Sequence, residues 1–279
     1  MNIANAISDI ERKAAEAIKA EQGDFIIDGL LHCGKCKTPK QTRVIFPFGE
    51  RTPMCLCKCA VEKRDREEAE RKRIEFENTV KKLRQAGFPE SDMQNWTFAN
   101  DDRTNEKITT VAKNYVENFS QMKEDGKGLL LFGEVGTGKT YTSACIANAL
   151  IDKGYPVLMT NFKRIANTEF GLFGGKQEYY DSFNRFPLLI LDDLGVERKS
   201  EYMQEIVYDV IDTRYKAGLP LIVTTNLTSD ELKHPAEITN QRTFSRLFEM
   251  CIPLKVEGVD RRREQLKDAH KKYKDILGY

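Results

Sequence analysis

The sequence predicts an α/β protein whose parallel β-sheet is covered by helices on both faces, preceded by a small cysteine-bearing domain and a long charged helix. After residue 101, five short apolar segments alternate with helical segments. This alternation is typical of parallel sheets, because each crossover between parallel strands leaves room for a helix. Upstream, five of the seven cysteines lie between Cys33 and Cys59. We therefore expect three parts, at residues 1–60, 61–100 and 101–279.

The composition excludes several classes of protein. The 279 residues carry 44 Lys and Arg against 43 Asp and Glu, so neither a basic nucleic-acid coat protein nor an acidic tail protein is expected. No apolar stretch approaches the roughly 18 residues that a membrane-spanning helix needs. The first 25 residues contain several charges and no apolar core, unlike a secretory signal. A cytoplasmic protein that contacts no membrane is predicted.

Two helices are expected before the sheet. Residues 1–22 place isoleucine and alanine at helical spacing, which predicts a short amphipathic helix. In residues 61–85 nearly every second position is charged and glycine and proline are absent, so we expect one long exposed helix there. Gly87 and Pro89 end it.

The strands and helices of the sheet domain follow from continuous apolar runs, which are typical of strands buried on both faces. Cys145 and Cys251 stand alone in apolar surroundings and are expected in the core. The expected helical stretches lie near residues 138–152, 162–183, 200–217 and 240–250. The strand candidates are residues 128–132, 156–160, 188–192, 221–225 and 252–256.

The first strand candidate leads into a glycine-rich loop. Residues 133–140, GEVGTGKT, fit the pattern G-x-x-x-x-G-K-[ST] and lie after a strand and before a helix, as this motif requires. The loop lets backbone N–H groups surround phosphates at the helix N-terminus, Lys139 reaches the β- and γ-phosphates, and Thr140 binds Mg²⁺. The expected nucleotide-binding residues here are Gly133, Gly136, Thr137, Gly138, Lys139 and Thr140.

The ends of two later strands supply polar groups for the same site. Asp192 and Asp193 end one apolar run on a strand expected to neighbour the phosphate loop, and Asn226 follows another run. We expect Asp192 to hold Mg²⁺, directly or through water, and Asp193 to orient or deprotonate the attacking water. Asn226 is expected between the phosphate loop and the acid pair, in contact with the γ-phosphate or that water. These residues predict ATP hydrolysis.

The order of GEVGTGKT, LLILDDLG, LIVTTN and QRTFSRLFE resembles the DnaC/IstB-type branch of the AAA+ ATPases, and within it the helicase loaders of bacteriophages and mobile elements. The resemblance covers about residues 96–263, and the cysteine-bearing part is similar as well. It implies an AAA+ P-loop sheet without a full C-terminal lid. It also implies ATP and Mg²⁺ as ligands, self-association through the ATPase domain, and a replicative DNA helicase and single-stranded DNA as partners.

The resemblance also assigns arginines. The family carries one that reaches the nucleotide of the neighbouring subunit, and Arg246 matches it, with Arg242 as a second candidate four residues earlier. A planar, permanently charged guanidinium suits the stabilisation of a transferring phosphate. Asp193 stands where many members have Glu, so slow, assembly-dependent hydrolysis is predicted. Arg262 is a substitute for the sensing arginine of the missing lid.

The clustered cysteines predict a structural zinc site. Cys33 and Cys36 form C-x₂-C, and three further cysteines follow after eighteen residues. Two close thiolate pairs are the usual ligands of tetrahedral Zn²⁺, and a redox role is disfavoured because no thioredoxin-like strand precedes them. In the resembled loaders this part engages the replicative helicase. The resemblance places the second pair at the last two cysteines, so the expected ligands are Cys33, Cys36, Cys57 and Cys59, with Cys55 and His32 as alternatives.

Single-stranded DNA has candidate contacts as well. Basic and aromatic residues interleave at residues 161–164 and 176–180, which suits attraction of the backbone and stacking of bases. Ser200 and Tyr202 match a family position near the central DNA path. Packing in the core is the alternative for each aromatic residue. Trp96 and Phe98 are candidates for a wall beside the adenine or for an anchor of the linker.

The sequence thus predicts an ATP-dependent loader that binds the replicative helicase through its N-terminal part and helps place it on single-stranded DNA. One alternative is an IstB-like transposition helper ATPase, which the cysteine segment and the nearly balanced charge of residues 1–100 disfavour. Another is an adaptor that uses bound ATP as a switch and does not hydrolyse it.

Overall fold

The computed structural model describes residues 21–47, 49–101, 105–172, 174–195, 200–235 and 237–261, and positions 263, 266, 273, 274, 277 and 278 beyond them. The chain divides into two compact units, Met1–Glu77 and Asn78–Tyr279. The amphipathic helix expected at residues 1–22 falls outside the described residues except for its last two. Arg262 lies outside them too, as do most of the residues after 261. The expectation that a full C-terminal lid is absent concerns this segment. No helix of the described residues is long and apolar enough to cross a membrane.

The first unit contains two short antiparallel hairpins. Strands β1 (Phe25–Ile27) and β2 (Leu30–His32) pair with each other, as do β3 (Val44–Phe46) and β4 (Gly49–Arg51). Asp28 and Gly29, between β1 and β2, both have positive φ, as a two-residue hairpin turn with the right twist requires. The strands have only three residues each, so the signal for the first hairpin was the Asp-Gly pair between two short apolar runs, which did not enter the prediction.

The expected charged helix forms as α2 (Lys58–Gly87), a few residues longer at each end than predicted. Along its first part, pairs such as Lys72–Glu68 at 2.7 Å and Arg73–Glu77 at 2.7 Å join residues one turn apart. Exposed pairs of this kind each stabilise a helix by only about 0.3–0.5 kcal/mol. The last turns gain more from packing, because Val80 and Leu83 contact the core of the second unit.

The second unit is built on a five-stranded parallel sheet with the order β6-β7-β8-β5-β9. All five expected strands are present, with ends shifted by no more than two residues. The strands are β5 (Gly128–Phe132), β6 (Val157–Asn161), β7 (Leu188–Leu194), β8 (Leu221–Thr225) and β9 (Cys251–Lys255).

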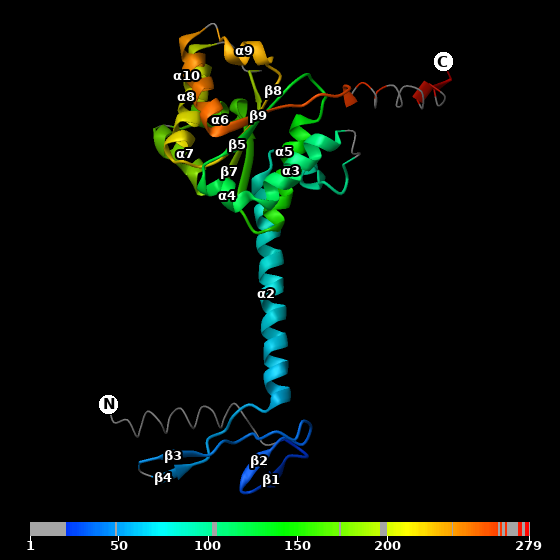
Figure 1. Cartoon of the computed structure of the whole chain (residues 1–279), viewed down its shortest axis with the longest axis vertical. Coiled ribbons are helices and arrows are strands. Elements are labelled where there is room, and N and C mark those ends of the chain that lie inside the picture. Colours follow the sequence, from blue (N-terminus) through cyan, green and yellow to red (C-terminus); the bar gives the residue numbers. More distant parts are fainter. Residues whose placement is uncertain are drawn as a thin grey trace. The chain divides into compact units, whose positions relative to one another are not determined.

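Helices cover both faces of this sheet, as predicted, and Figure 1 shows α3 and α5 on one side of it and α6, α8 and α10 on the other. Alternate residues of each strand serve the two cores: Leu129 and Leu131 pack with one, and Leu130 with the other. Cys145 and Cys251 are buried, as expected. The helices are α3 (Glu106–Glu117), α4 (Phe119–Glu124), α5 (Lys139–Asp152), α6 (Phe162–Phe170), α7 (Lys176–Ser182), α8 (Glu201–Lys216), α9 (Ser229–Lys233) and α10 (Ile238–Met250), with 3₁₀ turns at Ser91–Asn95 and Phe183–Arg185.

The prediction of one continuous helical stretch at residues 162–183 is wrong. Residues 162–183 form two helices, α6 and α7, because the chain between them contains glycines and Gly175 adopts a φ of 73° at the start of α7. A left-handed residue cannot continue an α-helix, and glycine adopts that conformation without steric penalty. The break leaves Phe170 as the last residue of α6.

Candidate nucleotide site and cysteine cluster

The phosphate loop connects β5 to α5. Gly136 and Gly138 have φ values of 80° and 95°, and Gly138 is the N-cap of α5. A Cβ atom at Gly136 would stand 2.0 Å from Oδ1 of Asp260, so a larger residue does not fit. The free N–H groups and the positive dipole end of a helix N-terminus favour an anion there. The backbone therefore has the form that a phosphate-binding loop requires.

Lys139 lies at the centre of this loop with only 5% of its surface exposed. Its Nζ donates to the carbonyl oxygens of Gly133 at 2.9 Å and Glu134 at 2.7 Å. The hydroxyl of Thr137 donates to the same Glu134 oxygen at 2.9 Å. These bonds hold the loop curled around the ammonium group, so the positive charge is placed before a nucleotide arrives.

The acid pair lies on a β-bulge. Between β7 and β8 the register shifts, so that the three steps from Leu191 to Leu194 oppose the two from Val223 to Thr225. Asp193, inside this bulge, has a φ of 58°, which is uncommon for a residue other than glycine. Bulges re-aim side chains and are frequent next to functional sites. The sequence showed the two acids but not the bulge that turns them.

A buried threonine, which the sequence analysis missed, positions both acids. The Thr224 hydroxyl donates to Oδ1 of Asp192 at 2.6 Å and accepts the backbone N–H of Asp193 at 2.9 Å. Burial raises the pKa of Asp192, and hydrogen bonds from Thr224 and Thr140 offset part of this rise. Carboxylate and hydroxyl oxygens are the ligands that Mg²⁺ prefers, so the donor set of Asp192 and Thr140 fits this ion.

The sheet order corrects one expectation and agrees with another. Strand β8 lies between β5 and β7, so the acid pair is two strands away from the phosphate loop and not on the neighbouring strand. Asn226 follows β8 and stands between the two, as predicted. The side chains of the three motifs meet at the carboxyl ends of parallel strands, where ligands bind in open α/β sheets.

A pocket of about 430 Å³ joins these groups, and its lining includes Lys139, Thr140, Asp193 and Asn226. Trp96 lies in it, with its ring 5.6 Å from that of Tyr141. Phe98, the other predicted candidate for a wall, packs against the same core as Trp96 but is not among the residues that line the pocket. The aromatic residue that directly follows the GKT motif was the signal for Tyr141, and the sequence analysis did not use it.

Among the described residues, Arg261 is the arginine that lines this pocket. Its backbone N–H donates to the Gly136 carbonyl oxygen at 3.1 Å, and its Nη1 lies 3.8 Å from Oδ1 of Asp101. The predicted residue, Arg262, is the next one along the chain and lies outside the described residues. Arg261 and Arg262 are adjacent in a run of three arginines, so the sequence alone does not tell which of them enters the pocket.

The two arginines proposed for the neighbouring subunit's site differ in their surroundings. Nη1 of Arg246 lies 2.8 Å from Oδ1 of Asp212, and its guanidinium lies 4.6 Å and 5.5 Å from the ring centres of Tyr208 and Tyr215. Arg242 lies one turn earlier on α10 and is exposed. Arg246 therefore fastens α10 to α8 within its own chain.

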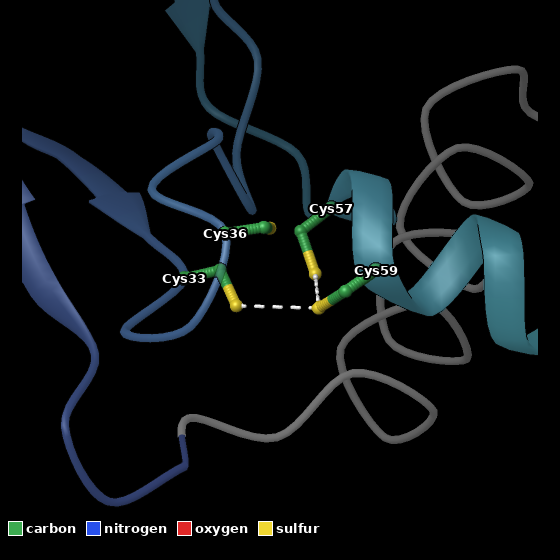
Figure 2. A group of neighbouring side chains, drawn as sticks. All are labelled: Cys33, Cys36, Cys57 and Cys59. Atoms are coloured by element: carbon green, nitrogen blue, oxygen red, sulfur yellow. Dashed lines mark hydrogen bonds between the residues drawn. The ribbon is translucent and has the colours of Figure 1, made fainter.

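In the first unit the four predicted zinc ligands come together (Figure 2). Their sulfur atoms all lie within 4.8 Å of one another, with 3.6 Å between Cys33 and Cys59 and 3.4 Å between Cys57 and Cys59. A tetrahedral ion with Zn–S bonds of about 2.3 Å has sulfurs about 3.8 Å apart. Cys55 contacts the Pro39 carbonyl oxygen and lies outside this group, as does His32.

The surroundings of the sulfurs favour a cation. Hydrogen bonds from Thr38 and the nearby backbone lower the pKa of Cys36 to about 5, whereas hydrogen bonds with Cys57 and Cys33 raise that of Cys59 to about 12. Crowded thiols cannot all ionise without a positive charge among them. Asp24 stabilises the segment that carries the first two cysteines, because its carboxylate accepts a hydrogen bond from the Gly34 N–H at 2.9 Å and pairs with the Lys40 ammonium at 2.6 Å. The group is compatible with structural zinc.

The candidate DNA contacts divide into two sets. Phe162 and Tyr180 are buried in the core, and Arg164 donates to the Pro89 carbonyl oxygen at 2.6 Å. For these aromatic residues the packing alternative holds. Lys163 and Tyr202, by contrast, line a second pocket, together with Ser200.

A parallel sheet with a glycine-rich phosphate loop after the interior strand β5 and an acid pair two strands away defines a P-loop ATP-binding protein of the AAA+ type. Residues 59–268 match the family described as IstB-like ATP binding protein, so the chain belongs to that family. The predicted resemblance to DnaC/IstB-type AAA+ ATPases is confirmed.

Similar proteins of known name include two replicative helicase loaders. DnaI of Bacillus subtilis (strain 168) is 28% identical over 167 residues, 56% of this chain and 52% of that protein. DnaC of Escherichia coli (strain K12) is 26% identical over 142 residues, 49% and 55% of the two chains. The chain thus spans about half the length of these relatives. A protein of Sinorhizobium fredii, named as an insertion-sequence ATP-binding protein, is 32% identical over 107 residues, 36% and 34% of the two chains.

The solved structure named "Crystal Structure of the DnaI" shares the fold of the second unit. It matches with a TM-score of 0.52 and 24% identity over 64% of this chain and 98% of that chain.

Proposed function

We propose that the chain is an ATP-dependent loader of a replicative DNA helicase. The observation that carries this proposal is that relatives matching its nucleotide-binding part are named replicative helicase loaders. The pocket beside the phosphate loop supports it, because the loop, the acid pair and Asn226 meet there. In this account ATP controls assembly, and the assembled chains help place the helicase on single-stranded DNA.

The residues of the nucleotide pocket have distinct proposed roles. Backbone N–H groups of the phosphate loop and the Lys139 ammonium bind the β- and γ-phosphates. Thr140 and Asp192 hold Mg²⁺, which when bound neutralises charge on the phosphates. Asp193 takes a proton from the attacking water, and Asn226 orients that water or contacts the γ-phosphate. Because an aspartate reaches less far than a glutamate, hydrolysis is slow.

Assembly completes the site with an arginine from a neighbouring copy. Arg246 is the residue that the family pattern selects, but it must first leave Asp212 to reach another subunit. Arg242 is exposed and reaches outward without breaking a contact. We propose that one of the two stabilises the transferring phosphate in trans, which makes hydrolysis depend on self-association.

The first unit is the proposed contact to the helicase. Zinc held by Cys33, Cys36, Cys57 and Cys59 would join the loop after β2 to the start of α2, so metal and fold are linked there. The two hairpins present exposed isoleucines, with Ile26 71% and Ile45 82% exposed. Burial of these apolar side chains against a partner would favour binding.

A transposition helper is the second candidate. The family description and the insertion-sequence relative favour it, because both carry the name of an ATP-binding protein and the relative's name refers to an insertion sequence. It differs from the loader in its partners, since it would bind duplex DNA and a transposase.

Co-elution with a hexameric replicative helicase, with and without ATP and Mg²⁺, tests the proposal. The unmodified chain is expected to co-elute, Cys36→Ser to lose binding, and Lys139→Ala to lose the dependence on ATP. Lys123→Ala, at an exposed lysine of α4 that is not among the residues lining the nucleotide pocket, is the control and should behave as the unmodified chain. Absence of co-elution in every state would favour the transposition helper. Phosphate release by the assembled, DNA-bound chain distinguishes the loader and the transposition helper from an adaptor that binds ATP without hydrolysing it.

A further inference from the structure

One asparagine is buried among apolar residues of the helix that follows the phosphate loop. Asn148 lies on α5, about two turns after Thr140, and is 1% exposed, whereas every other residue from Ala144 to Ile151 is apolar. A buried amide costs free energy unless its polar atoms are hydrogen-bonded, and asparagine favours a helix less than alanine does. The contacts of Asn148 therefore indicate what it contributes.

The amide nitrogen of Asn148 holds the segment that carries Trp96. Its Nδ2 donates to the carbonyl oxygens of Met93 at 2.8 Å and Trp96 at 2.9 Å, and to that of Ala144 in its own helix at 3.1 Å. A side-chain amide has two N–H donors, so both are used here. The backbone from Met93 to Trp96 is thereby fastened to α5.

The Trp96 ring is one wall of the nucleotide pocket. It lies 5.6 Å from the ring of Tyr141, whose hydroxyl donates to the Thr97 carbonyl oxygen at 3.2 Å. Lys139, the expected phosphate ligand, lines the same pocket. A flat aromatic ring in a pocket that also binds phosphates is suited to stack on the base of a nucleotide. Because side chains of α5 hold the backbone before and after Trp96, they set the direction of its ring.

The amide oxygen of Asn148 connects this segment to α2. Its Oδ1 accepts a hydrogen bond from Nε of Arg84 at 3.1 Å, and Nη2 of Arg84 pairs with the carboxylate of Asp152. Arg84 lies in the last turn of α2 and is not among the residues that line the nucleotide pocket. One buried side chain thus binds the Trp96 segment and the end of α2 at the same time.

We propose that Asn148 is a positioning residue that couples the base of ATP to α2. It sets the direction of the Trp96 ring, on which the base stacks, and through Arg84 it links base binding to the last turn of the helix. The inference rests on the nucleotide binding of the proposed function. It adds a connection from the ATP site to α2, the segment of the chain that leads to the first unit.

Calorimetric titration with Mg²⁺ and either ATP or inorganic triphosphate tests the positioning role. Triphosphate has no base, so its affinity reports the phosphate loop and the integrity of the fold. Asn148→Leu keeps the size of the side chain and removes its hydrogen bonds. It is expected to weaken ATP binding about two- to 13-fold, the range that contacts between aromatic rings contribute, and to leave triphosphate binding unchanged. Equal weakening of both ligands would overturn the inference.

Arg84→Met tests the link to α2, because coupling between two sites is reciprocal. It should weaken ATP binding by no more than Asn148→Leu does, leave triphosphate binding unchanged, and cause no further loss when combined with Asn148→Leu. The matched control is Arg73→Met, at an exposed arginine of α2 that pairs with Glu70 and Glu77, and it should bind both ligands as the unmodified chain does. An Arg84→Met chain that binds ATP as tightly as the unmodified chain would overturn the link.

Backbone hydrogen exchange of residues 78–87 gives an independent measure of the link. ATP is expected to slow exchange there in the unmodified chain and in Arg73→Met, but not in Arg84→Met, and triphosphate should slow it in none of them. If the unmodified chain binds neither ATP nor triphosphate, the nucleotide-binding part of the proposed function falls, and this inference with it. If it binds both, and Asn148→Leu and Arg84→Met keep the same preference for ATP over triphosphate, only the inference is overturned.

Discussion

Replacing Thr224 by valine removes the hydroxyl that positions the acid pair and keeps the shape of the side chain. The variant loses a charge-assisted hydrogen bond to Asp192 at 2.6 Å and a neutral one from the Asp193 N–H at 2.9 Å. The first kind stabilises a protein by about 1.5–3 kcal/mol and the second by about 1 kcal/mol. We therefore expect the free energy of unfolding to fall by about 2.5–4 kcal/mol.

The dependence of nucleotide binding on Mg²⁺ distinguishes a residue that positions a metal ligand from one that only stabilises the fold. Residues that hold a metal ligand in place change metal affinity by about 10- to 100-fold when they are lost. A fluorescent ATP analogue, titrated with Mg²⁺ and with a chelator, measures how much the ion strengthens nucleotide binding. The pKa of Asp192, already raised by burial, rises further without the Thr224 hydrogen bond. The Mg²⁺-dependent part of binding needs the ionised carboxylate, so it is lost at a higher pH in the variant.

Thr225→Val is the matched control. The Thr225 side chain is as buried as that of Thr224. Its hydroxyl donates a hydrogen bond to the Leu194 carbonyl oxygen at 2.6 Å and accepts one from the Leu227 N–H at 3.1 Å, and neither bond involves the acid pair. It should lower stability by about 2 kcal/mol and leave the effect of Mg²⁺ intact. Equal Mg²⁺ dependence in the two variants would refute the assignment of Thr224.

Three further outcomes are expected. Metal analysis should find one zinc per chain, lost in Cys36→Ser and kept in Cys55→Ser; loss in both would contradict the ligand set. Arg246→Ala should lower the free energy of unfolding by about 1–3 kcal/mol, because it removes one of the two cations that pair with Asp212 and the contact with two tyrosine rings of α8, whereas Arg242→Ala should change it by less than about 0.5 kcal/mol. Because the folded pKa of Asp192 lies above its unfolded value, its charge lowers stability at neutral pH and the penalty disappears as pH falls through the folded pKa. Asp192→Asn should therefore raise the Tm of the chelator-treated chain at pH 7, and an unchanged or lower Tm would contradict this.

The sheet was predictable because its strands are buried on both faces. Leu188 to Leu191 are all fully buried, so the apolar run coincides with the strand. The hairpins of the first unit had no such apolar run, since their strands have three residues each and are at most half-buried; the Asp-Gly pair between the first two strands was their signal in the sequence. The helix α3 was missed although its apolar residues follow a helical period, because no motif drew attention to it.

The site was predictable in its residue types but not in its contacts. The spacing of the motifs indicated which side chains meet, and the parallel topology brought them to one edge. The bulge at Asp193, the hydroxyl of Thr224 and the pairing of Arg246 with Asp212 depend on tertiary structure. Each joins residues from different elements, so no local pattern in the sequence encodes it.

Loading of a hexameric replicative helicase onto closed circular single-stranded DNA tests the central claim most directly, because a ring cannot thread onto a strand without ends. With ATP and Mg²⁺, the unmodified chain should increase the amount of helicase bound to the circle, and Lys139→Ala should not. An equal amount of bound helicase with and without the chain, while linear DNA of the same sequence binds it normally, would contradict the account.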